Sequence, residues 1–149
     1  MMSAGRERPM FRNILVPVDF TLKNEAALTA AIDLVKGSSD AKVTLLHVIE
    51  TIEHVEFDEM ADFYRSLETR SAAKLYGMEE RLKQAGISVY HEIVYGKRAE
   101  TIVAYAEERA VDLIVLSSHK VDRDHPALGI GTLSYRVAIV ARCPVLLVK

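Results

Sequence analysis

Apolar residues along this chain gather in five short runs, and longer stretches of mixed polarity separate them. The runs are Ile14–Val18, Val43–Ile49, Ile87–Val94, Leu113–Leu116 and Val145–Val148. Val, Ile and Leu dominate them, and short runs of this composition are typical of β-strands. The pattern therefore predicts five strands.

The stretches between the runs carry apolar residues at the spacing of amphipathic helices. Because strands and helices alternate strictly, we expect a parallel sheet with helices on both faces. The pattern predicts a single α/β domain of Rossmann-like or flavodoxin-like type. The residues expected to face the sheet are Ala27, Ala31, Leu34 and Val35; Met60, Phe63, Tyr64, Leu67, Ser71, Leu75, Met78, Leu82 and Ala85; Ile102, Val103, Ala106 and Ala110; and Leu133, Val137 and Val140.

Two of the predicted strands differ in the faces that they present. Ile87–Val94 alternates between apolar and polar residues, which is typical of a strand at the edge of a sheet. Val145–Val148 is apolar throughout. If this strand also lies at an edge, its free backbone groups and apolar side chains need a cover.

The size and charge of the chain exclude several classes of protein. Its 149 residues, 50% of them hydrophobic, suffice for one domain without disulfides. With 19 basic and 21 acidic residues it has no basic field for nucleic acid. No apolar run approaches the length of a membrane span, and the single Cys143 suits the reducing cytoplasm. We expect residues 1–10 to form a disordered tail before a domain of residues 11–149.

The first predicted strand leads into an aspartate, in the sequence Ile14-Leu15-Val16-Pro17-Val18-Asp19. Pro17 has no amide donor, so it suits a point where strand pairing is ending. In open parallel sheets, ligands bind at the carboxyl ends of strands, where the strand order reverses. Asp19 lies at such an end. Two interpretations remain open from the pattern alone: Asp19 contacts a ligand, or it caps the following turn.

A second polar segment follows the fourth predicted strand, and Gly129, Gly131 and Thr132 open the helix after it. Glycine lets a phosphate approach the backbone, and a helix N-terminus offers free amides to an anion. The Thr132 hydroxyl would add a donor. Glycine and threonine also begin many helices that bind nothing, so this pattern alone does not establish a phosphate site.

Six motifs together give the chain a specific resemblance to a known family. They are I-L-V-P-V-D (14–19), L-L-H-V-I (45–49), V-Y-G (94–96), D-L-I-V-L-S-S-H (112–119), G-T-L-S-Y-R-V (131–137) and C-P-V-L-L-V (143–148). In this order they resemble the universal stress protein family over residues 11–149. The resemblance implies a sheet of strand order 3-2-1-4-5 and a homodimer through the last strand, Val145–Val148. The family contains members that bind ATP and members that do not.

The resemblance also implies roles for individual residues. Asp19 and Val48 would contact adenosine with Leu116 and Pro17 beside them, while Gly131 and Thr132 would hold phosphate, with Gly129 nearby. By this resemblance, ATP-binding members carry a motif of G-x-x-G, a nine-residue spacer and then G-S or G-T. Here Ser117 and Lys120 replace the first two glycines, and the spacer, residues 121–130, is one residue longer. A Cβ at either position would hinder phosphate approach, although the Lys120 ammonium could bind phosphate by charge.

Three hypotheses about function follow. The first is a stress-response regulator, not an enzyme, that binds ATP or another adenine nucleotide weakly in the cleft between strands one and four and acts on an unidentified protein partner. The second is a dimeric interaction module of the same family whose cleft binds no nucleotide. The third is a metal-dependent phosphohydrolase that uses a loop otherwise interpreted as solvated: His119, Asp122, Asp124 and His125. We interpret His47 as a hydrogen-bonded core histidine and Cys143 as a buried, inert thiol.

Overall fold

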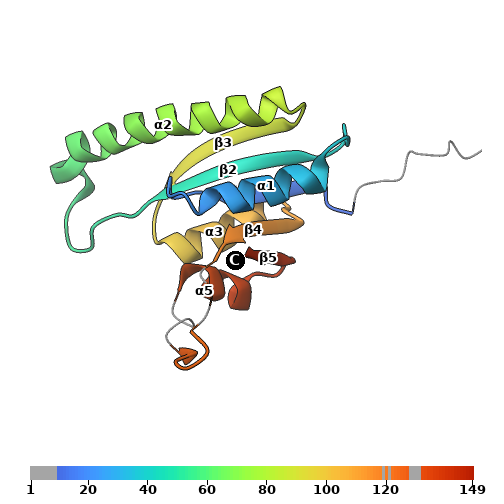
Figure 1. The fold of residues 1–149 in the computed structure, drawn as a ribbon. Coiled ribbons are helices and arrows are strands. Elements are labelled where there is room, and N and C mark those ends of the chain that lie inside the picture. The colour runs from blue at the N-terminus through green and yellow to red at the C-terminus, as the bar shows by residue number, and fades with distance from the viewer. Residues whose placement is uncertain (1–9, 119, 121, 128–131) are drawn as a thin grey trace, which may run out of the picture.

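The chain folds as an alternation of strands and helices in the computed structural model (Figure 1). The structure describes residues 10–118, 120, 122–127 and 132–149, so most of the predicted tail lies outside the described residues. The elements are β1 (Asn13–Pro17), α1 (Asn24–Val35), β2 (Lys42–Ile49), the 3-10 turn η1 (Phe57–Met60), α2 (Ala61–Gln84), β3 (Ser88–Tyr95), α3 (Arg98–Glu108), β4 (Leu113–Ser117), α5 (Leu133–Val140) and β5 (Val145–Val148).

The five strands form one parallel sheet in the order β3-β2-β1-β4-β5. This confirms the predicted α/β class, the parallel sheet and the strand order. β1 lies at the centre, paired with β2 on one side and β4 on the other. β3 and β5 are the two edge strands. This confirms the edge position predicted for Ile87–Val94.

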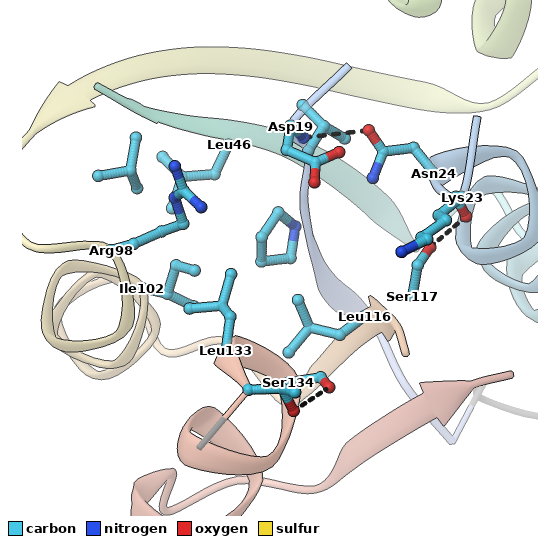
Figure 2. Close-up of a pocket in the computed structure, with 14 residues that line it drawn as sticks. Asp19, Lys23, Asn24, Leu46, Arg98, Ile102, Leu116, Ser117, Leu133 and Ser134 are labelled. Carbon is cyan, nitrogen blue, oxygen red and sulfur yellow. Dashed lines mark hydrogen bonds between the residues drawn. The ribbon is translucent and has the colours of Figure 1, made fainter. Parts of the chain in front are cut away.

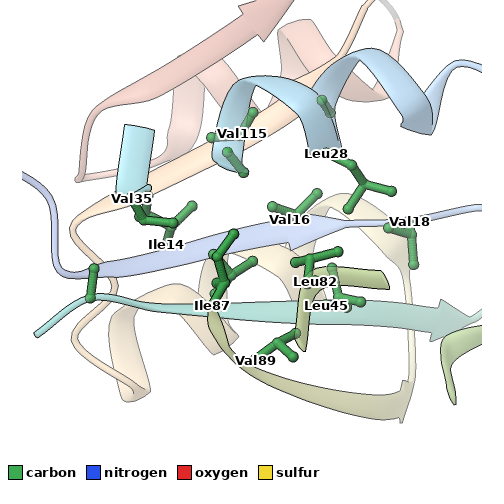
Figure 3. Packing of buried hydrophobic residues seen from close by; sticks show 14 of the residues in the cluster. Ile14, Val16, Val18, Leu28, Val35, Leu45, Leu82, Ile87, Val89 and Val115 are labelled. Carbon is green, nitrogen blue, oxygen red and sulfur yellow. The ribbon is translucent and has the colours of Figure 1, made fainter. Parts of the chain in front are cut away.

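Side chains of the central strand alternate between two cores, one on each face of the sheet. Ile14 and Val16 are fully buried in the core under α1 and α2, which Figure 3 shows. Leu15 points to the opposite core, under α3 and α5, with Ile102 and Val137. Full burial of such side chains stabilises the fold by about 1.5–3 kcal/mol each. Helices therefore cover both faces, as predicted.

Several residues predicted to face the sheet do not. Leu34 is 43% exposed and Phe63 is 45% exposed, because the buried faces of α1 and α2 are narrower than their apolar stripes. Val140, the last residue of α5, is 62% exposed. Ala110 lies beyond the end of α3 with φ 52°. Its amide donates to the Glu107 carbonyl and the Val111 amide to that of Ala106, so it belongs to the helix-ending turn.

The predicted strand bounds shift by one residue for physical reasons. β3 begins after Ile87 because the Ile87 amide donates to Leu82 in the turn that ends α2. β1 begins at Asn13, whose amide donates to the Asp112 carboxylate. β4 extends to Ser117, which pairs with Val148 of β5. The last predicted strand, Val145–Val148, has the predicted bounds.

Candidate functional site

A cleft opens where β1 and β4 stop pairing. In the described strands, β1 pairs with β4 only at Ile14 and Leu15, although both strands continue for several residues. The chain then leaves β1 for α1 on one face, while α5 packs on the other face. Strand order reverses here, and open α/β sheets bind ligands at this point.

A pocket occupies this cleft, and Figure 2 shows the side chains around it. They come from the carboxyl ends of β1, β2 and β4 and from the starts of α1, α3 and α5. The lining residues are Pro17, Val18, Asp19, Lys23, Asn24, Leu46, Val48, Arg98, Ile102, Leu116, Ser117, Thr132, Leu133 and Ser134.

The pocket has two halves of different chemistry. The apolar half consists of Pro17, Leu46, Val48, Ile102 and Leu116, all of which are buried. The hydroxyl half consists of Ser117, Thr132 and Ser134, beside the start of α5. The Ser134 hydroxyl lies 3.0 Å from that of buried Ser118, which holds it at the base of this half. A flat apolar group suits the first half, and an anion suits the second.

Asp19 organises the loop between the two halves. One of its carboxylate oxygens accepts hydrogen bonds from the Thr21 amide at 3.0 Å and the Thr21 hydroxyl at 2.7 Å. The side-chain oxygen of Asn24 accepts from the amides of Asp19 and Phe20, at 3.0 and 2.8 Å. These bonds hold Phe20 in the left-handed region, at φ 65°. The loop is thus preorganised, so Asp19 caps the turn and also lines the pocket.

The charge of Asp19 is stabilised by its surroundings. Partial burial alone would raise its pKa, but the hydrogen bonds from Thr21 and the positive charge of Arg98 outweigh burial. The pKa of Asp19 is therefore below its ordinary value. At neutral pH the pocket presents a carboxylate, which can accept hydrogen bonds from ligand hydroxyl or amino groups.

His47 lies on the far side of this loop. Its Nδ1–H donates to the Val18 carbonyl at 2.8 Å, and its ring lies 4.4 Å from that of Phe20 between centroids. Burial lowers the pKa of His47, and Arg98 lowers it further, although the bond to Val18 opposes this. The ring is hydrogen-bonded, as expected, but only partly buried.

Most of the predicted ligand residues meet in this pocket. Pro17, Asp19, Val48, Leu116, Ser117 and Thr132 all line it. Lys120 is exposed and is not among the lining residues. Gly129 and Gly131 lie outside the described residues. The pocket therefore holds the positions that the family resemblance assigns to adenosine, and one of those assigned to phosphate.

Two basic lining residues, Lys23 and Arg98, were not predicted from the sequence. Lys23 precedes α1, and its carbonyl accepts a hydrogen bond from the Ser117 hydroxyl. Arg98 is the first residue of α3. Helices that follow parallel strands begin at the same edge of the sheet as the strand ends. The charged residues at these helix starts were the signal that could have found them.

The polar loop after β4 forms no cluster of metal ligands in the part that the structure describes. His125 Nδ1 lies 3.1 Å from an Asp122 carboxylate oxygen, and both residues are exposed. His119 lies outside the described residues.

Elsewhere, the Cys143 thiol is partly buried, and burial raises its pKa. Among the described residues, no helix is long and apolar enough to cross a membrane.

The chain is similar to known proteins along nearly its whole length. The family model of the "Universal stress protein family" matches residues 10–149. Universal stress protein MJ0577 from Methanocaldococcus jannaschii is 29% identical over 157 residues, covering 94% of this chain and 96% of that protein. Universal stress protein YxiE from Bacillus subtilis is 25% identical over 150 residues, covering 94% of this chain and all of that protein.

Solved structures give the same result. The structure of MJ0577 has a TM-score of 0.79 with this chain at 30% identity, covering 94% of this chain and 96% of the other. Universal stress protein UspA from Lactobacillus plantarum also has a TM-score of 0.79, at 25% identity, covering 93% and 98%. The observed fold is thus an architecture that these proteins share.

Proposed function

The chain belongs to the universal stress protein family, and on this premise we propose that it is a stress-response regulator that binds an adenine nucleotide in the cleft between β1 and β4. The observation that carries the proposal is the pocket itself. It brings Asp19, Val48 and Leu116 to one cavity together with Thr132 of the hydroxyl half. The apolar half would hold the base, Asp19 would accept hydrogen bonds from the nucleoside, and the hydroxyl half would face the phosphate.

Two relatives of the same fold support the choice of an adenine nucleotide. One solved universal stress protein is in complex with cAMP, and another, from Archaeoglobus fulgidus, is in complex with dAMP. They are 21% and 16% identical to this chain, so they support the fold's capacity for such ligands and no residue-level comparison.

We propose that phosphate is bound less tightly than adenosine. Ser117 has a side chain at a position where the motif of ATP-binding members has glycine. Its hydroxyl donates a hydrogen bond to the Lys23 carbonyl. Lys120 is exposed and is not among the residues that line the pocket. Each lost hydrogen bond to a charged acceptor weakens binding by about 1.5–3 kcal/mol.

The output in this proposal is a change in partner binding and involves no catalytic step. A cytoplasmic location, which the single cysteine favours, is part of the same proposal. Calorimetric titration with adenosine, AMP, ADP and ATP tests whether the protein binds an adenine nucleotide. We expect all four to bind, with affinity rising little from adenosine to ATP. If none binds, the nucleotide proposal is wrong.

We also propose that the chain forms a homodimer through Val145–Val148. If the cleft binds no nucleotide, the chain acts as a dimeric interaction module. β5 is an edge strand with Leu146 39% exposed. Ile139 and Val140 of α5 are 72% and 62% exposed. A two-fold partner strand would cover this apolar edge.

Sedimentation of two matched variants tests the dimer. Leu146→Lys should give monomers or aggregates. Leu22→Lys changes a leucine that is 90% exposed, distant in sequence from β5, and should leave assembly unchanged. An unmodified protein that is monomeric at micromolar concentration would rule out the interface.

A further inference from the structure

Arg98 lines the pocket but makes no contact with the nucleotide in the site as proposed so far. It is the first residue of α3. Figure 2 shows the side chains of Arg98 and Ile102 on the α3 side of the pocket. Ser117 and Lys23 lie on the opposite side in the same view. The guanidinium therefore borders the apolar half and not the hydroxyl half.

The present partner of Arg98 is weakly held. Its guanidinium lies 3.7 Å from the Glu50 carboxylate, and the two side chains are 43% and 55% exposed. Ion pairs of this exposure contribute between 0 and about 1 kcal/mol. Arg98 can therefore exchange Glu50 for a ligand at little cost.

The charge of Arg98 acts on the interior of the cleft. Burial would raise the pKa of the lining residue Asp19, but the hydrogen bonds from Thr21, together with the charge of Arg98, keep that pKa below its ordinary value. A cation in this position would be costly beside an apolar surface if it were strongly hydrated. Guanidinium is weakly hydrated and planar, and it stacks readily on aromatic faces.

We propose that Arg98 is a specificity-determining residue that stacks its guanidinium on the base of a bound purine nucleotide. This rests on the proposed nucleotide site. The planar cation and Ile102 then contact the base from the α3 side, with Leu116 of the apolar half beside it. Because the contact is with the ring face, it serves nucleosides and nucleotides equally and favours the larger purine ring over a pyrimidine.

Calorimetry with adenosine, AMP and cytidine on four variants tests the proposal. Arg98→Ala should weaken adenosine and AMP by the same factor, about threefold to thirtyfold. Arg98→Lys keeps the charge without the planar face and should recover only part of this loss. Glu50→Gln releases Arg98 and should tighten adenosine by up to about fivefold. Arg109→Ala is the matched control. Arg109 also forms an exposed ion pair, with Glu92, and it lies over the Tyr105 ring and does not line the pocket.

A second readout follows stacking directly. The side-chain NMR signal of Arg98 Nε–H should move upfield when adenosine binds, because the guanidinium enters the ring current of the base. If Arg98→Ala weakens AMP but not adenosine, Arg98 binds phosphate and the stacking proposal is wrong. Adenosine binding that matches the Arg109→Ala control also overturns it while leaving the nucleotide site intact. If the unmodified protein binds no adenosine or AMP, both proposals fail together.

Discussion

The two halves of the cleft differ in how the fold holds them. Leu46, Ile102 and Leu116 of the apolar half are 0%, 1% and 3% exposed and belong to the core beneath α3 and α5. The hydroxyl half is formed where β4 ends and α5 begins, with the intervening loop between them. The same residues that fold the domain therefore shape the place for the base, while Ser117 and Thr132 on the phosphate side are only partly buried.

This difference teaches which properties can vary independently within the fold. A change in the apolar half must alter stability, since its side chains are core residues. A change at the partly buried Ser117 or Thr132 can alter affinity alone. Phosphate binding can thus weaken without loss of the fold or of the nucleoside site.

The largest effect should follow truncation in the apolar half. Ile102→Ala leaves a cavity in the core under α3, and we expect the free energy of unfolding to fall by about 2–5 kcal/mol. Urea unfolding measures it. Leu22→Ala, at a position that is 90% exposed, is the control and should change stability by less than about 0.5 kcal/mol. Equal losses in the two variants would contradict the description of the apolar half as core.

Removal of the carboxylate between the halves should come next. Asp19→Ala deletes a charged acceptor, so adenosine affinity should fall tenfold or more, about 1.5–3 kcal/mol. Calorimetry measures the change. Thr21→Val removes the hydroxyl that donates to Asp19 but keeps the carboxylate, and should weaken binding less. A Thr21 variant as impaired as Asp19→Ala would mean that Asp19 acts only through the loop.

Restored glycines should sharpen the contrast between the halves. Ser117→Gly combined with Lys120→Gly opens the backbone to phosphate, so ATP should bind about tenfold tighter, equivalent to one recovered hydrogen bond, and adenosine should change little. Lys120→Gly alone is the partial variant. If the unmodified protein binds ATP tightly and both variants weaken it, the present residues are the ones that hold phosphate.

The smallest effect should come from acid. The pKa of His47 is lowered in the folded protein, so the unfolded chain binds more protons below its ordinary pKa of about 6.5. Stability should therefore decline as pH falls through this value. Unfolding of His47→Gln should depend less on pH between about 7 and 5, since its amide keeps a donor for the Val18 carbonyl. A variant with the same pH dependence would show that other groups cause the decline.

Local patterns in the sequence determined most of the architecture. Every predicted strand forms, because Val, Ile and Leu runs such as Val43–Ile49 are buried on both faces of a parallel sheet. The strand order came from family resemblance and not from the pattern. Helix faces were less accurate, since a residue such as Leu34 matches the apolar spacing although nothing in the fold covers it.

The site divided in the same way. Asp19 was predictable because ligands bind at the ends of strands in a parallel sheet, whereas Val48 and Leu116 came from the family resemblance. Arg98 was not, because its place depends on where α3 begins relative to a strand more than eighty residues earlier in the chain. The distance of Lys120 from the lining was also hidden, since a loop's path is not set by periodicity.

Chemical-shift mapping of the unmodified protein with AMP shows which residues surround the bound nucleotide. Isotope-labelled protein is titrated while every backbone amide is followed. We predict that the largest shifts fall at residues 18–20, 46–48 and 116–118 and at the start of α5, the segments that surround the pocket. Saturating AMP that leaves these amides unmoved, or shifts confined to β5 or α2, would contradict a nucleotide site in the cleft between β1 and β4.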